Sequence, residues 1–257
     1  IADVKEEVIS LVSSGCKEIT LLGQNINSYG KGLPGNVTLG DLLSELNDLE
    51  GLERIRFVTS HPADISRELI RTMGRLGKVC EYLHMPAQSG SDQILKRMRR
   101  GYTVGYYRDL ISYARELIPR ISVASDFIVG FPGETDEEFQ ETVRLMEDIR
   151  FQNCFIFKYS PRTGTKAAEL EDDVADAVKK ARNMRLLELQ KGISLAENKK
   201  LIGREVQVLI EGVSKSDSNK LSGRTRQNHI VVFNGSGESV GKLVHVLIHE
   251  VTDLTLY

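Results

Sequence analysis

The stretch Ile121-Ser122-Val123-Ala124-Ser125-Asp126-Phe127-Ile128-Val129 is followed directly by Gly130-Phe131-Pro132-Gly133-Glu134-Thr135. The first part predicts the longest buried strand of the chain. The two glycines of the second part allow the backbone to approach a ligand closely. Thr135 can cap a helix predicted over Thr135–Ile149. The acidic residues near its first turn are favoured by the partial positive charge at the start of a helix. The stretch therefore predicts a strand, a turn and a helix in succession.

The same strand and helix patterns alternate through the first two-thirds of the chain. Strands are predicted over Lys17–Leu22, Arg54–Thr59, Glu81–Met85, Ile121–Val129 and Asn153–Tyr159. Helices are predicted over 2–14, Leu39–Leu49, Ile65–Met73, Ser91–Arg99, Gly105–Leu117 and Thr135–Ile149, with Thr38 and Ser91 as possible N-caps. This repetition predicts a parallel sheet with helical crossovers. The turns after the strands then open on one face, where such folds place their chemistry.

The pattern changes after this region. Residues 172–201 predict one long polar helix, in which Val178 to Lys200 hold seven Lys or Arg against two Glu. Short β-rich runs follow, at Glu205–Ile210, Leu221–Thr225, His229–Phe233, Leu243–Ile248 and Asp253–Leu256. Several short strands in about fifty-five residues predict a small all-β barrel. We expect an α/β domain over residues 1–200 and the barrel over residues 201–257.

Composition excludes some classes of partner. The net charge of −2 over 257 residues gives no sign of nucleic-acid binding by the whole molecule, so such a partner must be recognised by local patches. No apolar stretch is long enough to span a bilayer, and the start of the chain is not a signal peptide. Cys16, Cys80 and Cys154 lie more than sixty residues apart, which favours a reducing cytoplasm and buried apolar roles over metal ligation.

Two turns carry residues suited to a small ligand. Amides in Gly23-Gln24-Asn25 and the residues after it can bind an amino or carboxylate group, although an Asx-rich loop needs no ligand. The turn Gly130–Glu134 suits hydroxyls or a cationic group better than a phosphate, because acidic residues crowd the helix end that follows. A tight turn without a ligand is the alternative there. His61 is a better candidate for the site than His84, which sits inside an apolar strand.

One basic cluster has an adjacent aromatic residue. The segment Lys96-Arg97-Met98-Arg99-Arg100-Gly101-Tyr102-Thr103 fits phosphate contact with base stacking. A solvated helix end is the alternative, since cations are favoured there in any case. The basic residues of the long helix are similarly ambiguous.

Six collinear segments together resemble the methylthiotransferase branch of the radical S-adenosylmethionine enzymes. They are Leu21–Gly30, Arg56–Pro62, His84–Asp92, Met98–Thr103, Asp126–Thr135 and Tyr159–Thr165. The forms Gly-Gln-Asn-x-Asn-Ser-Tyr-Gly and Gln-Ser-Gly-Ser-Asp look like the MiaB-type tRNA enzymes. The terminal β module resembles a TRAM domain, a small RNA-binding barrel. The resemblance covers essentially the whole chain and implies a partial parallel β/α barrel of the radical SAM type.

The resemblance also implies an activity and its cofactors. The activity is methylthiolation at C2 of N(6)-isopentenyladenosine beside the anticodon, so the expected partner is the anticodon stem-loop of tRNA and neither DNA nor a membrane. The cofactors are S-adenosylmethionine and [4Fe-4S] clusters. The family's Cys-x3-Cys-x2-Cys loop is expected upstream of Ile1, with a further cluster-bearing domain before it. We therefore expect this polypeptide to be a fragment that is inactive alone and that carries no cluster ligand.

Roles for individual residues follow from the resemblance. Gln24 and Asn25 are expected to bind the methionyl amino or carboxylate group. The adenosine pocket is expected to be lined by Ser89, Asp126, Gly130 and Glu134. Phosphates of tRNA are expected at Arg99, Arg100 and the basic helix, and the anticodon stem at Arg224, Arg226 and His229. No catalytic residue is assigned.

Four other functions remain open at this point. The first two are a methylthiotransferase for a ribosomal protein, which the Gly-Gln-Asn motif disfavours, and one for another modified tRNA adenosine. The third is a non-catalytic RNA-binding protein that keeps the barrel as a scaffold. The fourth is a β/α aldolase, which needs a lysine at a strand end that Lys158 could supply.

Overall fold

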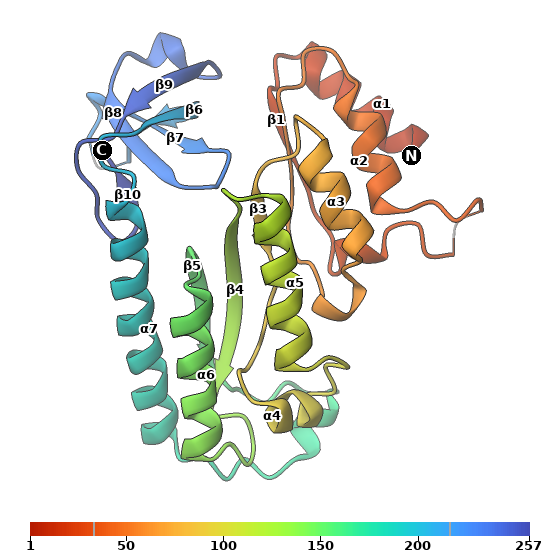
Figure 1. Cartoon of the computed structure of the whole chain (residues 1–257), viewed down its shortest axis with the longest axis vertical. Helices are drawn as coiled ribbons and strands as arrows, with labels where there is room; N and C mark the ends of the chain where they lie inside the picture. The colour runs from red at the N-terminus through yellow and green to blue at the C-terminus, as the bar shows by residue number, and fades with distance from the viewer. Residues whose placement is uncertain (33, 216) are drawn as a thin grey trace.

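The computed structural model describes residues 1–32, 34–215 and 217–257. Five parallel strands run through its first part (Figure 1). They are β1 (Glu18–Leu21), β2 (Arg54–Phe57), β3 (Tyr82–His84), β4 (Ser122–Val129) and β5 (Asn153–Lys158). β1 pairs with β2, β4 pairs with both β3 and β5, and Ile55 beside Val79 links the two groups. The predicted parallel β/α fold is confirmed.

Helices connect these strands in the predicted order. They are α1 (Ala2–Ser13), α2 (Leu39–Asn47), α3 (Arg67–Arg75), α4 (Asp92–Arg97), α5 (Val104–Leu117) and α6 (Asp136–Ile149). Thr38 and Thr135 each accept a hydrogen bond from the third residue of the helix, and both form a capping box as their residue types favour. The predicted side-chain cap at Ser91 is wrong, because the buried Ser91 hydroxyl makes no bond to the first turn of α4.

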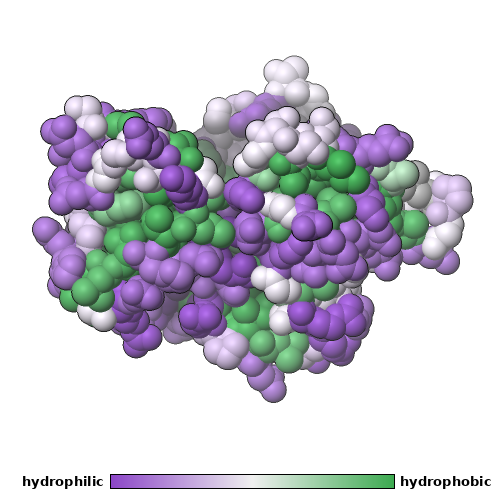
Figure 2. Space-filling view, turned by 90° about the horizontal axis from the view of Figure 1, so that it is seen from above, coloured by the Kyte–Doolittle hydropathy of each residue, from purple (hydrophilic) through white to green (hydrophobic). Residues whose placement is uncertain are grey.

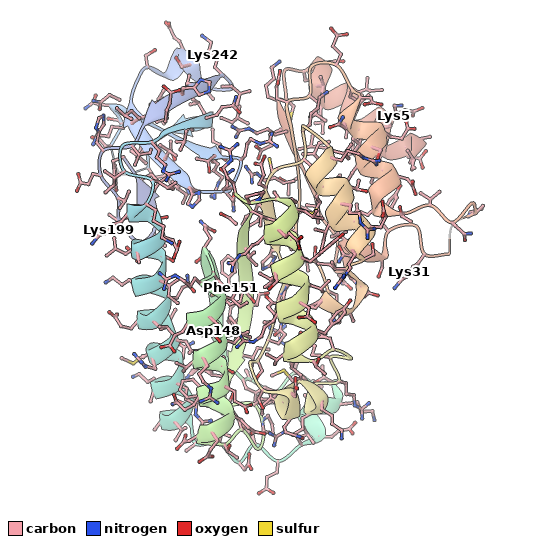
Figure 3. The ribbon with its side chains drawn as sticks, in the orientation of Figure 1. Lys5, Lys31, Asp148, Phe151, Lys199 and Lys242 are labelled. Atoms are coloured by element: carbon pink, nitrogen blue, oxygen red, sulfur yellow. The ribbon has the colours of Figure 1, made fainter. Side chains whose placement is uncertain are left out.

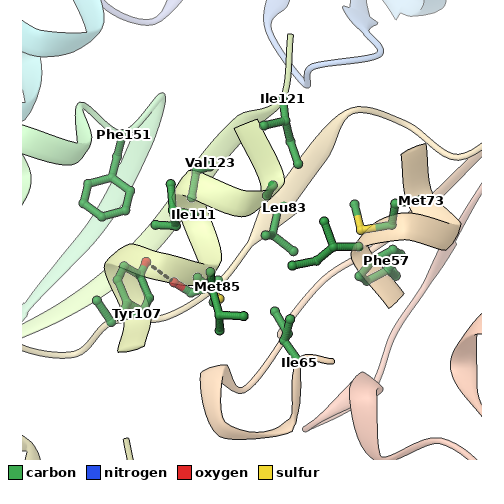
Figure 4. Close-up of a cluster of buried hydrophobic side chains, with 14 of the residues drawn as sticks. Phe57, Ile65, Met73, Leu83, Met85, Tyr107, Ile111, Ile121, Val123 and Phe151 are labelled. Atoms are coloured by element: carbon green, nitrogen blue, oxygen red, sulfur yellow. Dashed lines mark hydrogen bonds between the residues drawn. The ribbon is translucent and has the colours of Figure 1, made fainter. Parts of the chain in front are cut away.

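The core lies between the sheet and helices α2, α3, α5 and α6 (Figure 4). Apolar side chains such as Leu83 on β3, Val123 on β4 and Ile111 on α5 are buried together there. Tyr107 is also buried, and its hydroxyl donates to the carbonyl oxygen of Met85 at 2.7 Å (Figure 4). The one polar atom of that ring is therefore satisfied inside the core, as burial requires.

The long helix α7 (Asp176–Lys199) packs against β5 and α6 (Figure 1). It begins at Asp176, whereas the sequence predicted a start near residue 172. Two acidic side chains hold the preceding segment outside the helix. Asp172 binds the ammonium of Lys179 at 2.5 Å, and Asp173 accepts the N–H of Gly133 at 2.6 Å. The first bond holds the segment against α7 itself, and the second attaches it to the turn after β4.

The rest of the chain is an all-β module, as predicted. Its strands are β6 (Glu205–Val213), β7 (Lys220–Thr225), β8 (Ile230–Asn234), β9 (Leu243–Leu247) and β10 (Thr255–Leu256). They form one sheet in the order β10-β8-β7-β6-β9 around a small core of Val208, Val231, Ile248 and Leu256. Seen from this end, the molecule shows hydrophobic patches interleaved with hydrophilic residues (Figure 2).

The all-β module lies at the amino ends of the parallel strands (Figure 1). Side chains occupy the space between them (Figure 3). Arg54 on β2 is buried and donates to the carbonyl oxygen of Arg224 at 2.8 Å. Arg56 donates to the carbonyl oxygen of Thr225 at 2.5 Å and to the carboxylate of Glu18 at 2.7 Å. Two arginines of the first domain thus hold the backbone of the second by charge-assisted hydrogen bonds.

A search of the helices in the described ranges finds none with the length and apolar character needed to cross a bilayer.

Candidate functional site

The turns that follow the five parallel strands meet at one edge of the sheet, opposite the all-β module (Figure 1). Three of these turns begin with left-handed backbone, at Thr59 (φ 68°), Gln88 (φ 67°) and Gly130 (φ 68°). Such conformations are uncommon for residues other than glycine, so Thr59 and Gln88 are held there by their surroundings. This edge is where open and closed parallel sheets bind ligands.

The turn after β1 is tied to the next strand end by Asn25. Its amide Nδ2 donates to Asp64 at 2.5 Å and to Ser28 Oγ at 2.9 Å. Lys31 also binds Asp64, at 2.8 Å, and this hydrogen bond lowers the pKa of the Asp64 carboxyl. Within the described residues, Asn25 Oδ1 and Asn27 Oδ1 are buried without a hydrogen-bond partner. Two unmet acceptors beside an ionised carboxylate suit a cationic donor such as an ammonium group.

Gln24 lies in the same turn with an exposed side chain. It makes no hydrogen bond to any residue that the structure describes, so its amide is free to meet a ligand. The structure thus places Gln24 and Asn25 in one turn. The Gln24 side chain is exposed, and the Asn25 side chain is fixed by its hydrogen bonds.

His84 and Asp126 form a pair between β3 and β4. His84 Nε2 lies 3.0 Å from Asp126 Oδ1, and His84 Nδ1 accepts the backbone N–H of Thr59 at 3.3 Å. Because Nδ1 is an acceptor, Nε2 carries the proton and donates to the carboxylate. The ring also meets Phe155 of β5 edge to face, with centroids 6.1 Å apart. Both ring nitrogens of His84 therefore have hydrogen-bond partners, as predicted, and Nε2 orients the Asp126 carboxylate.

Phe155 and Phe157 on β5 are exposed aromatic side chains that sequence reasoning missed. Their exposed fractions are 49% and 54%, while Cys154 on the opposite face of the strand is buried. Side chains alternate along a strand, so both phenylalanines belong to the face that carries Asp126 on β4, beside Phe155 in the sheet. The i, i+2 spacing in Phe155-Ile156-Phe157 was the available signal.

Ser89 is buried within the turn after β3. Its Oγ accepts the N–H of Ser91 at 3.1 Å and lies 3.4 Å from Thr142 Oγ1 on α6. Gly90 packs so closely on α6 that an added Cβ would lie 2.5 Å from the carbonyl oxygen of Glu141. The turn is therefore shaped by its own contacts, and Ser89 supports it from inside.

The turn after β4 is closed by Glu134. Its carboxylate accepts the N–H of Gly130 at 2.6 Å and binds Arg182 of α7 at 2.7 Å. Burial raises the pKa of this carboxyl, and the bonds from Gly130 and Arg182 oppose that shift. An added Cβ at Gly130 would lie 2.3 Å from Lys179 Cγ. The Glu134 side chain thus holds the turn in place, and the backbone of Gly133 is bound by Asp173 and Arg97.

A basic cavity lies at the same edge, beside the turn after β4. Its volume is about 370 Å³, and its walls include Phe131 and Tyr159. Five cationic residues and no acidic ones line it: Arg97, Arg99, Arg100, Arg162 and Lys166. Arg97 is bound to Glu138 and to the Gly133 carbonyl oxygen, and Lys166 is bound to Glu169. Among the residues described, Arg99, Arg100 and Arg162 have no ion pair, so their guanidinium groups can take phosphate.

The three residues predicted to contact RNA from the all-β module face the junction between the domains. Arg226 binds Glu81 at 2.9 Å and the carbonyl oxygen of Val79 at 2.6 Å. Arg224 binds Asn228 Oδ1 at 3.2 Å. Burial and the nearby Arg56 lower the pKa of His229 to about 4, so that ring is neutral at pH 7. Their contact with RNA remains a prediction.

His61 lies at this edge too. Its Nδ1 accepts the N–H of Ala63 at 3.3 Å, and its ring meets Tyr102 edge to face. Burial, with the charge of Arg100 nearby, lowers the pKa of the His61 imidazole. Lys158, at the end of β5, is paired with Asp176 at 2.8 Å, so it is not a free strand-end amine.

The described residues include no group of three or more histidine, cysteine or acidic side chains that could hold a metal ion. Cys80 and Cys154 are buried and Cys16 is half-buried, and all three are free. Burial raises the pKa of the Cys80 thiol to about 11. Among the described residues, therefore, the three cysteines do not form part of a metal site.

Comparison with known proteins agrees with this arrangement. A model of the Radical SAM superfamily matches residues 1–146, and a model of the TRAM domain matches residues 199–257. Coproporphyrinogen III oxidase of Escherichia coli, described as a radical SAM enzyme, has a TM-score of 0.56 over 86% of this chain and 58% of its own, with 12% identity. At that identity the likeness supports the fold alone.

Two relatives are much closer in sequence. The tRNA-2-methylthio-N(6)-dimethylallyladenosine synthase of Thermoanaerobacter sp. (strain X514) is 54% identical over 254 residues, which cover 99% of this chain and 54% of the relative. The protein of the same name from Carboxydothermus hydrogenoformans is 50% identical over 248 residues, covering 96% and 56%. The chain spans about half the length of the curated relatives it matches. By its sequence and its fold, the chain belongs to the Radical SAM superfamily.

Proposed function

We propose that this chain is the radical SAM and TRAM portion of a tRNA methylthiotransferase. The product is 2-methylthio-N(6)-isopentenyladenosine beside the anticodon, and the division between the two domains falls near residue 201. The observation that carries the proposal is the identity of 54% over 254 residues with a synthase of that name. Because the chain spans about half of that relative, the activity is proposed for the whole protein.

S-adenosylmethionine, bound with a reduced [4Fe-4S] cluster, supplies radical chemistry that activates a carbon–hydrogen bond. In this chain, Gln24 and Asn25 would hold the methionyl amino or carboxylate group, and the unmet acceptors of that turn beside Asp64 favour the amino group. Asp126 and the backbone of the Gly130–Glu134 turn hold the adenosine. Ser89 supports the neighbouring turn, which follows β3, from its buried position. The described residues include no set of side chains that could serve as the cluster ligands.

The anticodon stem-loop is the proposed partner at the same edge. Arg99 and Arg100 line the basic cavity with Phe131 and Tyr159, a combination that offers charge to phosphates and faces to bases. Phe155 and Phe157 add an exposed aromatic surface next to Asp126. Free buried thiols at Cys80 and Cys154 suit the reducing cytoplasm in which tRNA is modified.

The test is mass spectrometry of tRNA nucleosides from a strain that lacks the gene. Loss of the 2-methylthio mark, with accumulation of N(6)-isopentenyladenosine, supports the proposal, and a plasmid copy of the wild-type gene should restore the mark. An unchanged nucleoside profile contradicts it. Ribosomal proteins from the same strain are analysed in parallel, because loss of a methylthio group there would assign the chemistry to a protein substrate.

A further inference from the structure

A second cavity lies where the TRAM domain meets the amino end of the parallel sheet. Its volume is about 490 Å³. Helices α5, α6 and α7 contribute residues near their carboxyl ends, β4 contributes its first residues, and the TRAM domain contributes the start of β6 with Thr225 and His229. The cavity is therefore built by both domains, and nothing in the proposed reaction uses it.

The walls of this junction cavity are strongly basic. Its cationic residues are Arg115, Arg120, Arg150, Lys200 and Arg204, and its acidic residues are Glu197 and Glu205. Arg150 and Lys200 both bind Glu197, so that carboxylate is already neutralised. The excess of three positive charges concentrates a field that attracts an anion.

Two of these guanidinium groups are uncommitted. Arg120 follows α5 and precedes β4, and Arg204 precedes β6, so each comes from a different domain. Both are exposed, and neither forms a hydrogen bond or ion pair through its side chain with any described residue. Arginine presents a fork of donors that matches phosphate oxygens. His229, which also lines the cavity, is neutral at pH 7 and contributes no charge of its own.

We propose that the junction cavity binds the phosphodiester backbone of RNA through Arg120 and Arg204. This inference rests on the proposed function for the choice of RNA as the partner. The cavity differs from the basic cavity that contains Arg99 and Arg100, because the two lie at opposite ends of β4. The eight residues Ser122 to Val129 separate them, or about 25 Å at the rise of a strand. An RNA that reaches both must be several nucleotides long.

The experiment measures binding of a fluorescein-labelled 17-nucleotide RNA hairpin to the purified 257-residue chain by fluorescence anisotropy at several salt concentrations. The test variant is R120Q/R204Q. The matched control is R75Q/R144Q, which removes two exposed arginines that have no partner among the described residues and lie outside the junction cavity. Thermal melting verifies that each variant is folded.

The expected result is a loss of affinity of about tenfold for R120Q/R204Q at low salt, with the slope of log K against log salt shallower by about 1.5 for two lost phosphate contacts. The control variant should keep the wild-type affinity within about twofold. A wild-type affinity and slope in R120Q/R204Q would overturn the inference and leave the proposed function intact. No binding of the hairpin by the wild-type chain would overturn the inference, while the nucleoside analysis of the deletion strain tests the proposed function separately.

A second measurement needs no variant. Phenylglyoxal modifies accessible arginines, and mass spectrometry identifies the sites. Bound RNA should protect Arg120 and Arg204 and leave Arg75 and Arg144 reactive. Equal reactivity of Arg120 and Arg204 with and without RNA, at a concentration that saturates the anisotropy signal, would overturn the inference even if R120Q/R204Q failed to fold.

Discussion

Arg182 of α7 donates from Nη1 to the carboxylate of Glu134 at 2.7 Å, and both side chains are almost fully buried. The same carboxylate accepts the N–H of Gly130, so the pair connects the long helix to the turn after β4. Arg182 also binds Asp136 at the start of α6. The shape of the proposed adenosine turn therefore depends on a helix that begins more than forty residues later in the chain.

Glu134→Ala should lower the free energy of unfolding by about 3 kcal/mol, because it leaves the buried Arg182 without its main partner. Glu134→Gln should cost less, since an amide oxygen can still accept one of the two bonds. Urea denaturation measures both. The control is Glu68→Ala, which removes an exposed pair with Arg71 and should leave the midpoint nearly unchanged. Equal midpoints for the alanine variants at 134 and 68 would contradict the structural role of the pair.

The contact between the domains gives a second prediction. Arg56→Met removes the bonds to Thr225 and Arg226 and leaves the half-buried Glu18 with Arg54 alone, at 3.6 Å. We expect the variant to lose about 3 kcal/mol and to unfold in two calorimetric transitions, since the TRAM domain is then held less firmly. Arg108→Met, which breaks an exposed pair with Asp148, is the control and should keep the wild-type profile. A single unshifted transition in Arg56→Met would count against the contact.

Much of the fold could be predicted from the sequence because its signals are local. Apolar runs end at turn residues, so all five parallel strands were located to within a few residues. Thr38 and Thr135 have an acidic residue three positions later, and both form the expected caps. The start of α7 was placed too early because Asp172 folds back to bind Lys179 of the helix and Asp173 binds Gly133 in the turn after β4.

The contacts between distant segments could not be predicted in this way. In Arg54-Ile55-Arg56-Phe57, alternation indicates a solvated face for the arginines, yet both are buried by a module about 170 residues away. Arg226 of the same all-β module also lies at the junction between the domains, where Glu81 binds it. The pairing of His84 with Asp126 likewise needs the register of β3 on β4. A single sequence does not reveal which segments become neighbours.

The pKa of His229 gives a prediction about pH. Burial, with Arg56 nearby, lowers it from 6.5 to about 4, so between these values the unfolded chain binds a proton that the folded chain does not. Stability is therefore full above pH 6.5 and falls as the pH drops towards 4, by about 3 kcal/mol for this residue. His229→Gln should lose that part of the dependence. The difference between the melting temperatures of the two proteins at pH 7 and pH 4.5 measures it, and parallel pH profiles would contradict it.

The last prediction separates the two groups of arginines expected to meet RNA. R99Q/R100Q should weaken binding of an RNA hairpin by about tenfold and make its salt dependence shallower, because these guanidinium groups line the basic cavity and have no partner in the described chain.

Arg226→Gln should act differently. It breaks the bonds to Glu81 and Val79 at the junction, so its first effect is a lower unfolding midpoint. Anisotropy at several salt concentrations and thermal melting, applied to both variants, distinguish these effects. If Arg226→Gln makes the salt dependence shallower at an unchanged melting temperature, then Arg226 leaves Glu81 to bind RNA, and the RNA surface of the TRAM domain includes the junction.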